Sequence, residues 1–107
     1  MKSVTPLELR AWLADTSRRQ PLLLDVREPW ETQICSIEPS ERVPMQSLPA
    51  RLHELDPAQP VVCICHHGGR SMHVAQFLSR QGFEDVYNLT GGVDAWARQV
   101  DAAMPTY

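Results

Sequence analysis

The chain has 107 residues, of which 43% are hydrophobic and 21% charged, and its formal net charge is -3. This composition is typical of an ordinary globular protein, and the length predicts one domain, residues 1–107, with a single core. No run approaches the roughly 18 apolar residues of a membrane span, and the scattered Lys and Arg form no basic stripe. Neither a membrane nor a nucleic acid is therefore an expected partner.

The cysteine count and the first residues indicate a compartment. There are three cysteines, an odd number that forms no disulfide framework. Residues 1–6 lack the apolar core of a signal peptide. Free thiols persist in a reducing environment, so we expect a cytoplasmic protein.

The first half of the chain predicts helix, strand, helix and an irregular stretch. Thr5-Pro6-Leu7-Glu8 has the pattern of a capping box with proline at the first helical position, and it predicts a helix ending near Asp15. The apolar run at 22–26 is typical of a buried strand. A short helix is expected at 28–34. Residues 35–45 predict an irregular connection with a short strand at 42–44.

The second half alternates strands and helices more regularly. Ser47 is expected to cap a helix that ends at Asp56-Pro57, before a strand at 61–65. A helix from Ser71 should stop at Gly82. A strand at 85–89 and a last helix after Gly91-Gly92 complete the chain. This alternation predicts an α/β fold, with a mostly parallel central sheet flanked by helices on both faces.

The segment from Cys65 to Arg70, Cys-His-His-Gly-Gly-Arg, joins a strand to a helix. Ligands of such sheets bind beyond the carboxyl ends of strands, which is where Cys65 is placed. Free N–H groups of a glycine-containing turn and of a helix N-terminus favour a thiolate over a thiol. The guanidinium of Arg70 can bind an anion through two parallel hydrogen bonds. The segment therefore predicts a reactive cysteine beside a substrate clamp.

Neighbouring residues admit plainer interpretations. Cys63 is expected in the core, with a resolving role after oxidation left open, and Cys35 has no assigned role. His66 and His67 are expected to act chiefly through their backbone N–H groups, with a side-chain role open. No metal is expected, because adjacent residues at one strand end do not easily surround an ion tetrahedrally.

Several residues outside the loop also favour structural roles. An Asp-x-Arg pair after a buried strand, here Asp25 and Arg27, is expected to tie loops together through hydrogen bonds, and the alternative is a pair of charges at the active-site mouth. Gly91 and Gly92 fit a turn that needs positive φ, and Trp96 fits core packing. Trp30 either lines the active-site pocket or packs beneath it.

Three separated motifs resemble those of the rhodanese-like family of single-domain sulfurtransferases. They are Leu24-Asp25-Val26-Arg27-Glu28, Cys65-His66-His67-Gly68-Gly69-Arg70-Ser71 and Leu89-Thr90-Gly91-Gly92-Val93-Asp94-Ala95-Trp96. The resemblance spans nearly the whole chain and implies the rhodanese fold. It implies that Cys65 takes a sulfane sulfur from a small anionic donor such as thiosulfate and becomes a persulfide. The sulfur then passes to a thiophilic acceptor such as cyanide or a protein thiol.

The same resemblance implies which residues bind the donor and leaves two alternatives. Cys65 is the catalytic nucleophile, no cofactor is needed, and the expected donor-binding residues are His66, His67, Gly68, Gly69, Arg70 and Ser71. Phosphatase and arsenate reductase relatives have one more residue between cysteine and arginine than the four present here. The first alternative is therefore such a variant, which this loop length disfavours. The second is a non-catalytic binding or regulatory module of the same fold.

Overall fold

A computed structural model describes residues 1–107 as five parallel strands in one sheet, in the order β1-β5-β4-β2-β3. The strands are β1 (Lys2–Val4), β2 (Leu22–Asp25), β3 (Glu41–Arg42), β4 (Val61–Ile64) and β5 (Val86–Leu89). The helices are α1 (Pro6–Ala14), α2 (Pro29–Ile34), α3 (Leu48–Arg51), α4 (Gly69–Arg80) and α5 (Gly92–Gln99), with 3-10 turns at Met45–Ser47 and Leu52–Glu54. The predicted α/β class and parallel sheet are confirmed.

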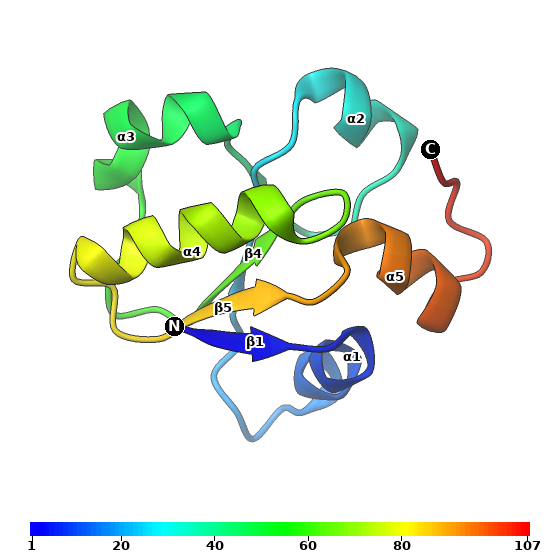
Figure 1. Ribbon diagram of the computed structural model, residues 1–107. Coiled ribbons are helices and arrows are strands. Elements are labelled where there is room, and N and C mark those ends of the chain that lie inside the picture. Colours follow the sequence, from blue (N-terminus) through cyan, green and yellow to red (C-terminus); the bar gives the residue numbers. More distant parts are fainter.

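The sheet separates two apolar cores, and helices lie on both of its faces (Figure 1). Side chains of a strand alternate between its faces, so Val62 and Ile64 of β4 point one way and Val61 and Cys63 the other. The first face packs against α1 and α5, and the second against α4 and the segment around α3. Strand β4 is central, between β2 and β5, and all four of its residues are buried.

Local sequence signals explain the ends of several helices. The hydroxyl of Thr5 accepts from the Glu8 N–H at 3.1 Å, and the Glu8 carboxylate accepts from the Thr5 N–H at 2.9 Å. The predicted capping box is therefore confirmed. Helix α4 begins at Gly69, two residues before the predicted start at Ser71, and it ends before Gly82, whose φ is +92°.

Three details differ from the sequence predictions. Ser47 makes no side-chain cap, and the helix expected after it is only four residues long, between two 3-10 turns. Strand β3 lies at Glu41–Arg42, one residue before the expected 42–44. Strand β1 is not predicted, because three residues with one buried side chain at a sheet edge have no readable period.

The last residues return to the end of β4, where the Tyr107 ring stacks on His66. After α5, the chain curls back so that its end lies close to α2 (Figure 1). The hydroxyl of Tyr107 is 2.9 Å from the Glu31 carboxylate of α2. Segments far apart in sequence therefore meet near the end of β4.

Candidate active site

Cys65 directly follows β4 and is 1% exposed. Its Sγ accepts from the Gly68 N–H at 3.1 Å and lies 3.3 Å from Oγ of Ser71. The sulfur is thus sheltered from bulk water and already held by one backbone amide. This is the arrangement expected for a nucleophile at the carboxyl end of a central strand.

The loop after Cys65 leaves a set of unused backbone donors. Gly68 has a φ of +103° and precedes α4, which starts at Gly69. No protein acceptor is within hydrogen-bond reach of five N–H groups, those of His66, His67, Gly69, Arg70 and Ser71. Such donors at a helix start are suited to an anion.

The start of α5 fixes the other side of the loop. The Val93 N–H donates to the Cys65 carbonyl at 3.0 Å, and the Asp94 N–H donates to the His66 carbonyl at 3.1 Å. A Cβ on Gly92 would lie 2.4 Å from both carbonyl oxygens, so only glycine permits this approach. The φ values of Gly91 and Gly92 are +77° and +61°, as expected for the turn. The glycine pair therefore also positions the loop that follows Cys65.

Arg70 is paired with a residue that the sequence analysis missed. Its Nη1 and Nη2 donate to the two carboxylate oxygens of Glu31 at 2.8 and 2.7 Å. This contact lowers the pKa of Glu31 from its ordinary value of 4.5 to about 2 and raises the pKa of Arg70. A guanidinium has five N–H groups, and this pair uses two of them. The other N–H groups of Arg70 have no acceptor in the protein and are able to bind an anion.

A buried network behind Glu31 holds α2 to the sheet. Arg27 and Asp25, both 1% exposed, form an ion pair with a shortest distance of 2.7 Å, and Arg27 also donates to the Cys35 carbonyl at 2.8 Å. The Tyr107 hydroxyl accepts from Arg27 at 3.0 Å and donates to Glu31 at 2.9 Å. The contacts of Asp25 and Arg27 tie the segment after β2 to the segment after α2, which is the structural role expected of them.

The side chains of the two histidines form a stack with Tyr107. The ring of His66 lies between those of His67 and Tyr107, with centroid distances of 3.9 and 3.8 Å. Burial lowers the pKa of His66, and its Nε2 is buried without a hydrogen-bond partner. Their peptide groups form the first part of the loop between β4 and α4.

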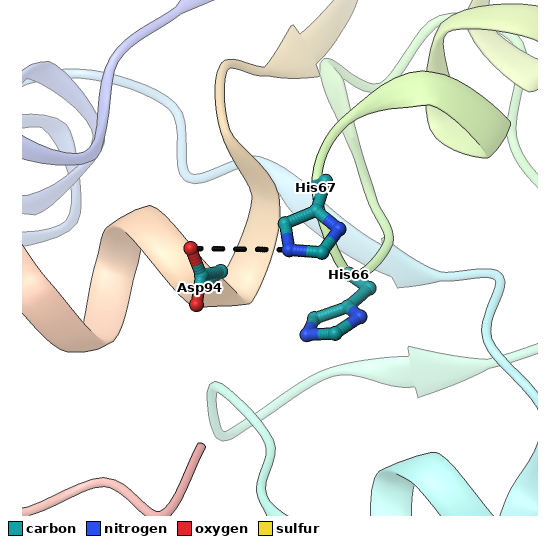
Figure 2. A group of neighbouring side chains, drawn as sticks. All are labelled: His66, His67 and Asp94. Carbon is teal, nitrogen blue, oxygen red and sulfur yellow. Dashed lines mark ion pairs between the residues drawn. The ribbon is translucent and has the colours of Figure 1, made fainter. Parts of the chain in front are cut away.

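His66, His67 and Asp94 are the cluster that could hold a metal ion, and they lie together on the loop and α5 (Figure 2). A tetrahedral ion about 2.1 Å from each ring nitrogen must lie in the planes of both imidazoles. The two rings are stacked at 3.9 Å with an interplanar angle of 27°, which keeps their planes apart. This arrangement does not fit such an ion.

Asn88 is a second residue that the sequence analysis missed. It is 3% exposed on β5, its Nδ2 donates to the Gly68 carbonyl at 3.1 Å, and its Oδ1 is bonded to the Ser71 hydroxyl. A polar residue within the apolar run 86–89 was the available signal. Glu31 gave a weaker signal, as the third residue of a capping box with Glu28.

The remaining candidates lie outside the reacting centre. Cys63 is fully buried, and burial raises its pKa to about 12, which suits the expected core role. Cys35 is buried and lies 3.8 Å from a nitrogen of Arg27. Trp30 is 60% exposed and meets Tyr107 edge to face at 5.7 Å. It therefore does not pack beneath the pocket.

The fold and the cysteine loop together define a rhodanese-like domain. Residues 5–99 match the family model described as "Rhodanese-like domain", so the chain belongs to this family. A Staphylococcus saprophyticus protein of known structure superposes with a TM-score of 0.84 at 32% identity, covering 94% of this chain and 97% of that one. A rhodanese-like domain protein from Staphylococcus aureus gives a TM-score of 0.83 at 29% identity, covering 100% and 99%.

Among curated relatives, the chain is 34% identical over 92 residues to "Thiosulfate sulfurtransferase GlpE" of Vibrio cholerae, covering 86% of this chain and 87% of that protein. It is also 42% identical over 89 residues to the chloroplastic "Rhodanese-like/PpiC domain-containing protein 12" of Arabidopsis thaliana. That match covers 79% of this chain and 30% of the plant protein, so the chain spans under a third of this relative. The sulfurtransferase relatives support sulfur transfer as the general activity. None of the helices is long and apolar enough to cross a membrane.

Proposed function

We propose that the protein transfers a sulfane sulfur from thiosulfate, or from a related persulfide donor, to a thiophilic acceptor through a persulfide on Cys65. The observation that carries the proposal is the buried Cys65 sulfur, held by the Gly68 N–H at 3.1 Å within a loop of unused amide donors. Such donors stabilise a negatively charged sulfur without further reorganisation.

The proposed reaction has two displacement steps. The Cys65 thiolate attacks the outer sulfur of thiosulfate, a new S–S bond forms, and sulfite leaves with the electron pair of the old one. Cyanide or a protein thiolate then attacks the outer sulfur of the persulfide. The Cys65 thiolate leaves with the electron pair of the S–S bond and is regenerated, so no external oxidant or reductant is consumed.

Arg70 is proposed to bind the anionic donor through the N–H groups that Glu31 does not use. The bidentate contact with Glu31, at 2.7 and 2.8 Å, fixes the guanidinium, so its remaining donors are already oriented when the donor arrives. The amides of His66, His67, Gly69 and Ser71 would complete the site. A protein thiol, as donor or acceptor, remains a proposed partner on the same chemistry.

The test is thiocyanate formation from thiosulfate and cyanide, together with the intact mass after thiosulfate treatment. Cys65→Ser should reduce turnover to background and should not gain a sulfur atom. Cys63→Ala is the matched control, because Cys63 lies two residues earlier in the buried strand, and it should keep most of the activity. Turnover in Cys65→Ser close to that of the unmodified protein would contradict the proposal. Full occupancy by sulfur without turnover would favour the binding-module alternative.

A second comparison separates binding of the donor by Arg70 from the contact of Arg70 with Glu31. If Arg70 binds the donor, Arg70→Ala should raise KM for thiosulfate at least about tenfold, the loss expected for a charge-assisted contact. Glu31→Gln removes the partner charge but keeps the guanidinium, and it should raise KM much less. Equal effects of the two variants would mean that Arg70 acts only through Glu31. Aryl phosphate hydrolysis at a rate comparable to sulfur transfer would instead support the phosphatase alternative.

A further inference from the structure

The side chain of Asn88 is held in one orientation by two buried contacts. Its Nδ2 donates to the Gly68 carbonyl at 3.1 Å, and its Oδ1 is bonded to Oγ of Ser71. The reverse amide orientation would place the Oδ1 acceptor against the carbonyl of Gly68, which is itself only an acceptor. Oδ1 of Asn88 therefore faces the Ser71 hydroxyl.

That hydroxyl has one proton for two neighbours. Oγ of Ser71 is also 3.3 Å from Sγ of Cys65, and both residues are buried. Because Oδ1 of Asn88 can only accept, the Ser71 proton is used in that bond. The Ser71 oxygen then presents a lone pair to the sulfur, which suits a neutral S–H donor and opposes a thiolate.

We propose that Asn88 is a positioning residue that acts through Ser71 to favour the neutral thiol of Cys65 in the resting protein. When Cys65 ionises, the Ser71 hydroxyl turns to donate to the sulfur, and Oδ1 of Asn88 loses its bond. Because Asn88 is 3% exposed, water does not easily replace this bond. The hydrogen bond between Ser71 and Asn88 therefore adds a free-energy cost to forming the Cys65 thiolate. Its importance for sulfur transfer rests on the proposed function.

Other charged and titratable groups around Cys65 remain in place when Asn88 is changed. They come from the same strand, the loop, α4, α2 and α5: Cys63, His66, His67, Arg70, Glu31 and Asp94. The guanidinium of Arg70 interacts electrostatically with Cys65. Variants of Asn88 and Ser71 keep these groups. A double-mutant cycle of the two residues therefore isolates the effect that Asn88 has on Cys65 through the Ser71 hydroxyl.

The experiment follows alkylation of Cys65 by iodoacetamide against pH, with peptide mass giving the yield at this cysteine alone. Asn88→Leu frees the Ser71 proton for the sulfur, so the pH of half-maximal alkylation rate should fall by about one unit, the effect of one charge-assisted hydrogen bond. In Ser71→Ala the same Asn88→Leu change should produce little shift. An equal shift in both backgrounds, or no shift in either, would overturn the proposal.

A measurement without changing Asn88 keeps the proposal testable if Asn88→Leu does not fold. In an NMR titration, the side-chain amide signal of Asn88 should move with the same midpoint as Cys65 alkylation. The movement should be much smaller in Ser71→Ala. A signal that does not respond in the unmodified protein would contradict the proposal. Neither readout requires turnover, so failure of thiosulfate turnover and failure of this inference are distinguishable.

Discussion

At the scale of single residues, the site depends on charged and polar groups that the loop motif does not contain. The Glu31 carboxylate, 4% exposed, accepts two hydrogen bonds from Arg70, one from Tyr107 and one from the Glu28 N–H. A carboxylate with these partners is strongly stabilised in its charged form. Protonating it should therefore weaken both the site and the fold.

The pH dependence of stability should report this carboxylate. The pKa of Glu31 is lowered from 4.5 to about 2, so its contribution is fully present above pH 4.5 and is lost as the pH falls towards 2. At neutral pH that contribution is at most about 3 kcal/mol, discounted because Arg70 is partly exposed. Urea unfolding at several pH values should show Glu31→Gln less stable than the unmodified protein at pH 7, with the difference narrowing between pH 4.5 and 2.

The matched control for this prediction is Glu84→Gln, which changes an exposed carboxylate that forms no ion pair. It should change the unfolding free energy by less than about 0.5 kcal/mol at any pH. A difference for Glu31→Gln that stays constant from pH 7 to 2 would mean that the Arg70 contact does not stabilise the fold.

At the scale of elements, the glycine turn before α5 positions the loop that follows Cys65. Gly92 combines a φ of +61° with a backbone approach that leaves no room for a Cβ. Gly92→Ala should therefore lower the unfolding free energy by about 2 to 4 kcal/mol, from left-handed strain plus steric overlap. The same change should disturb the Cys65 carbonyl contact and reduce turnover.

Two other glycines separate backbone strain from steric overlap as causes of the lower unfolding free energy expected for Gly92→Ala. Gly82 has a φ of +92°, but a Cβ at this position would meet only open space, so Gly82→Ala should cost only about 1 kcal/mol of strain. Gly69 has neither restriction, and Gly69→Ala at the start of α4 should leave stability unchanged or raise it by up to about 1 kcal/mol. Equal losses of unfolding free energy in Gly82→Ala and Gly92→Ala would show that the close approach of Gly92 to the Cys65 and His66 carbonyls does not affect stability.

The two expected helix caps give a further test at this scale. Thr5 accepts from the Glu8 N–H, whereas Ser47 makes no side-chain cap. Thr5→Ala should lower the unfolding free energy by about 1 kcal/mol, and Ser47→Ala by less than about 0.5 kcal/mol. Chemical denaturation of both variants measures this. Equal losses would mean that the capping box of α1 adds nothing.

At the scale of the whole molecule, Tyr107 joins the end of the chain to α2 and to the loop that follows Cys65. Its hydroxyl bonds to Arg27 and Glu31, and its ring stacks on His66. Tyr107→Phe keeps the ring but leaves two buried groups each short of one hydrogen bond. It should lower the unfolding free energy by about 1 to 2 kcal/mol.

Tyr107→Ala also removes the stacked ring. It should therefore lower the unfolding free energy by at least about 1 kcal/mol more than Tyr107→Phe does. Thr106→Ala is the control, since Thr106 is exposed and its side chain makes no hydrogen bond. Guanidinium unfolding of the three variants checks the order. If Tyr107→Phe is as stable as the unmodified protein, the hydroxyl network does not anchor this segment.

Most of the fold was predictable because its signals are local. Buried strands appear as apolar runs at 22–26, 61–65 and 85–89, and capping and glycine signals mark the helices. The predictions failed or shifted where the structure of a short segment depends on its surroundings. The pattern around Ser47 did not show that the expected helix would break into short turns, and β1 and β3 are short edge strands that depend on their neighbours.

The sequence by itself determined the family and the general chemistry, because the three motifs that carry them are contiguous segments, and it predicted the loop from Cys65 to Ser71 as the site. Only the tertiary structure decided what surrounds that loop. Glu31 pairs with Arg70 across 39 residues, Asn88 reaches Ser71 across 17, and Tyr107 reaches Glu31 across 76. Such contacts leave no sequence period, since they depend on which strand ends and helices the sheet order brings together.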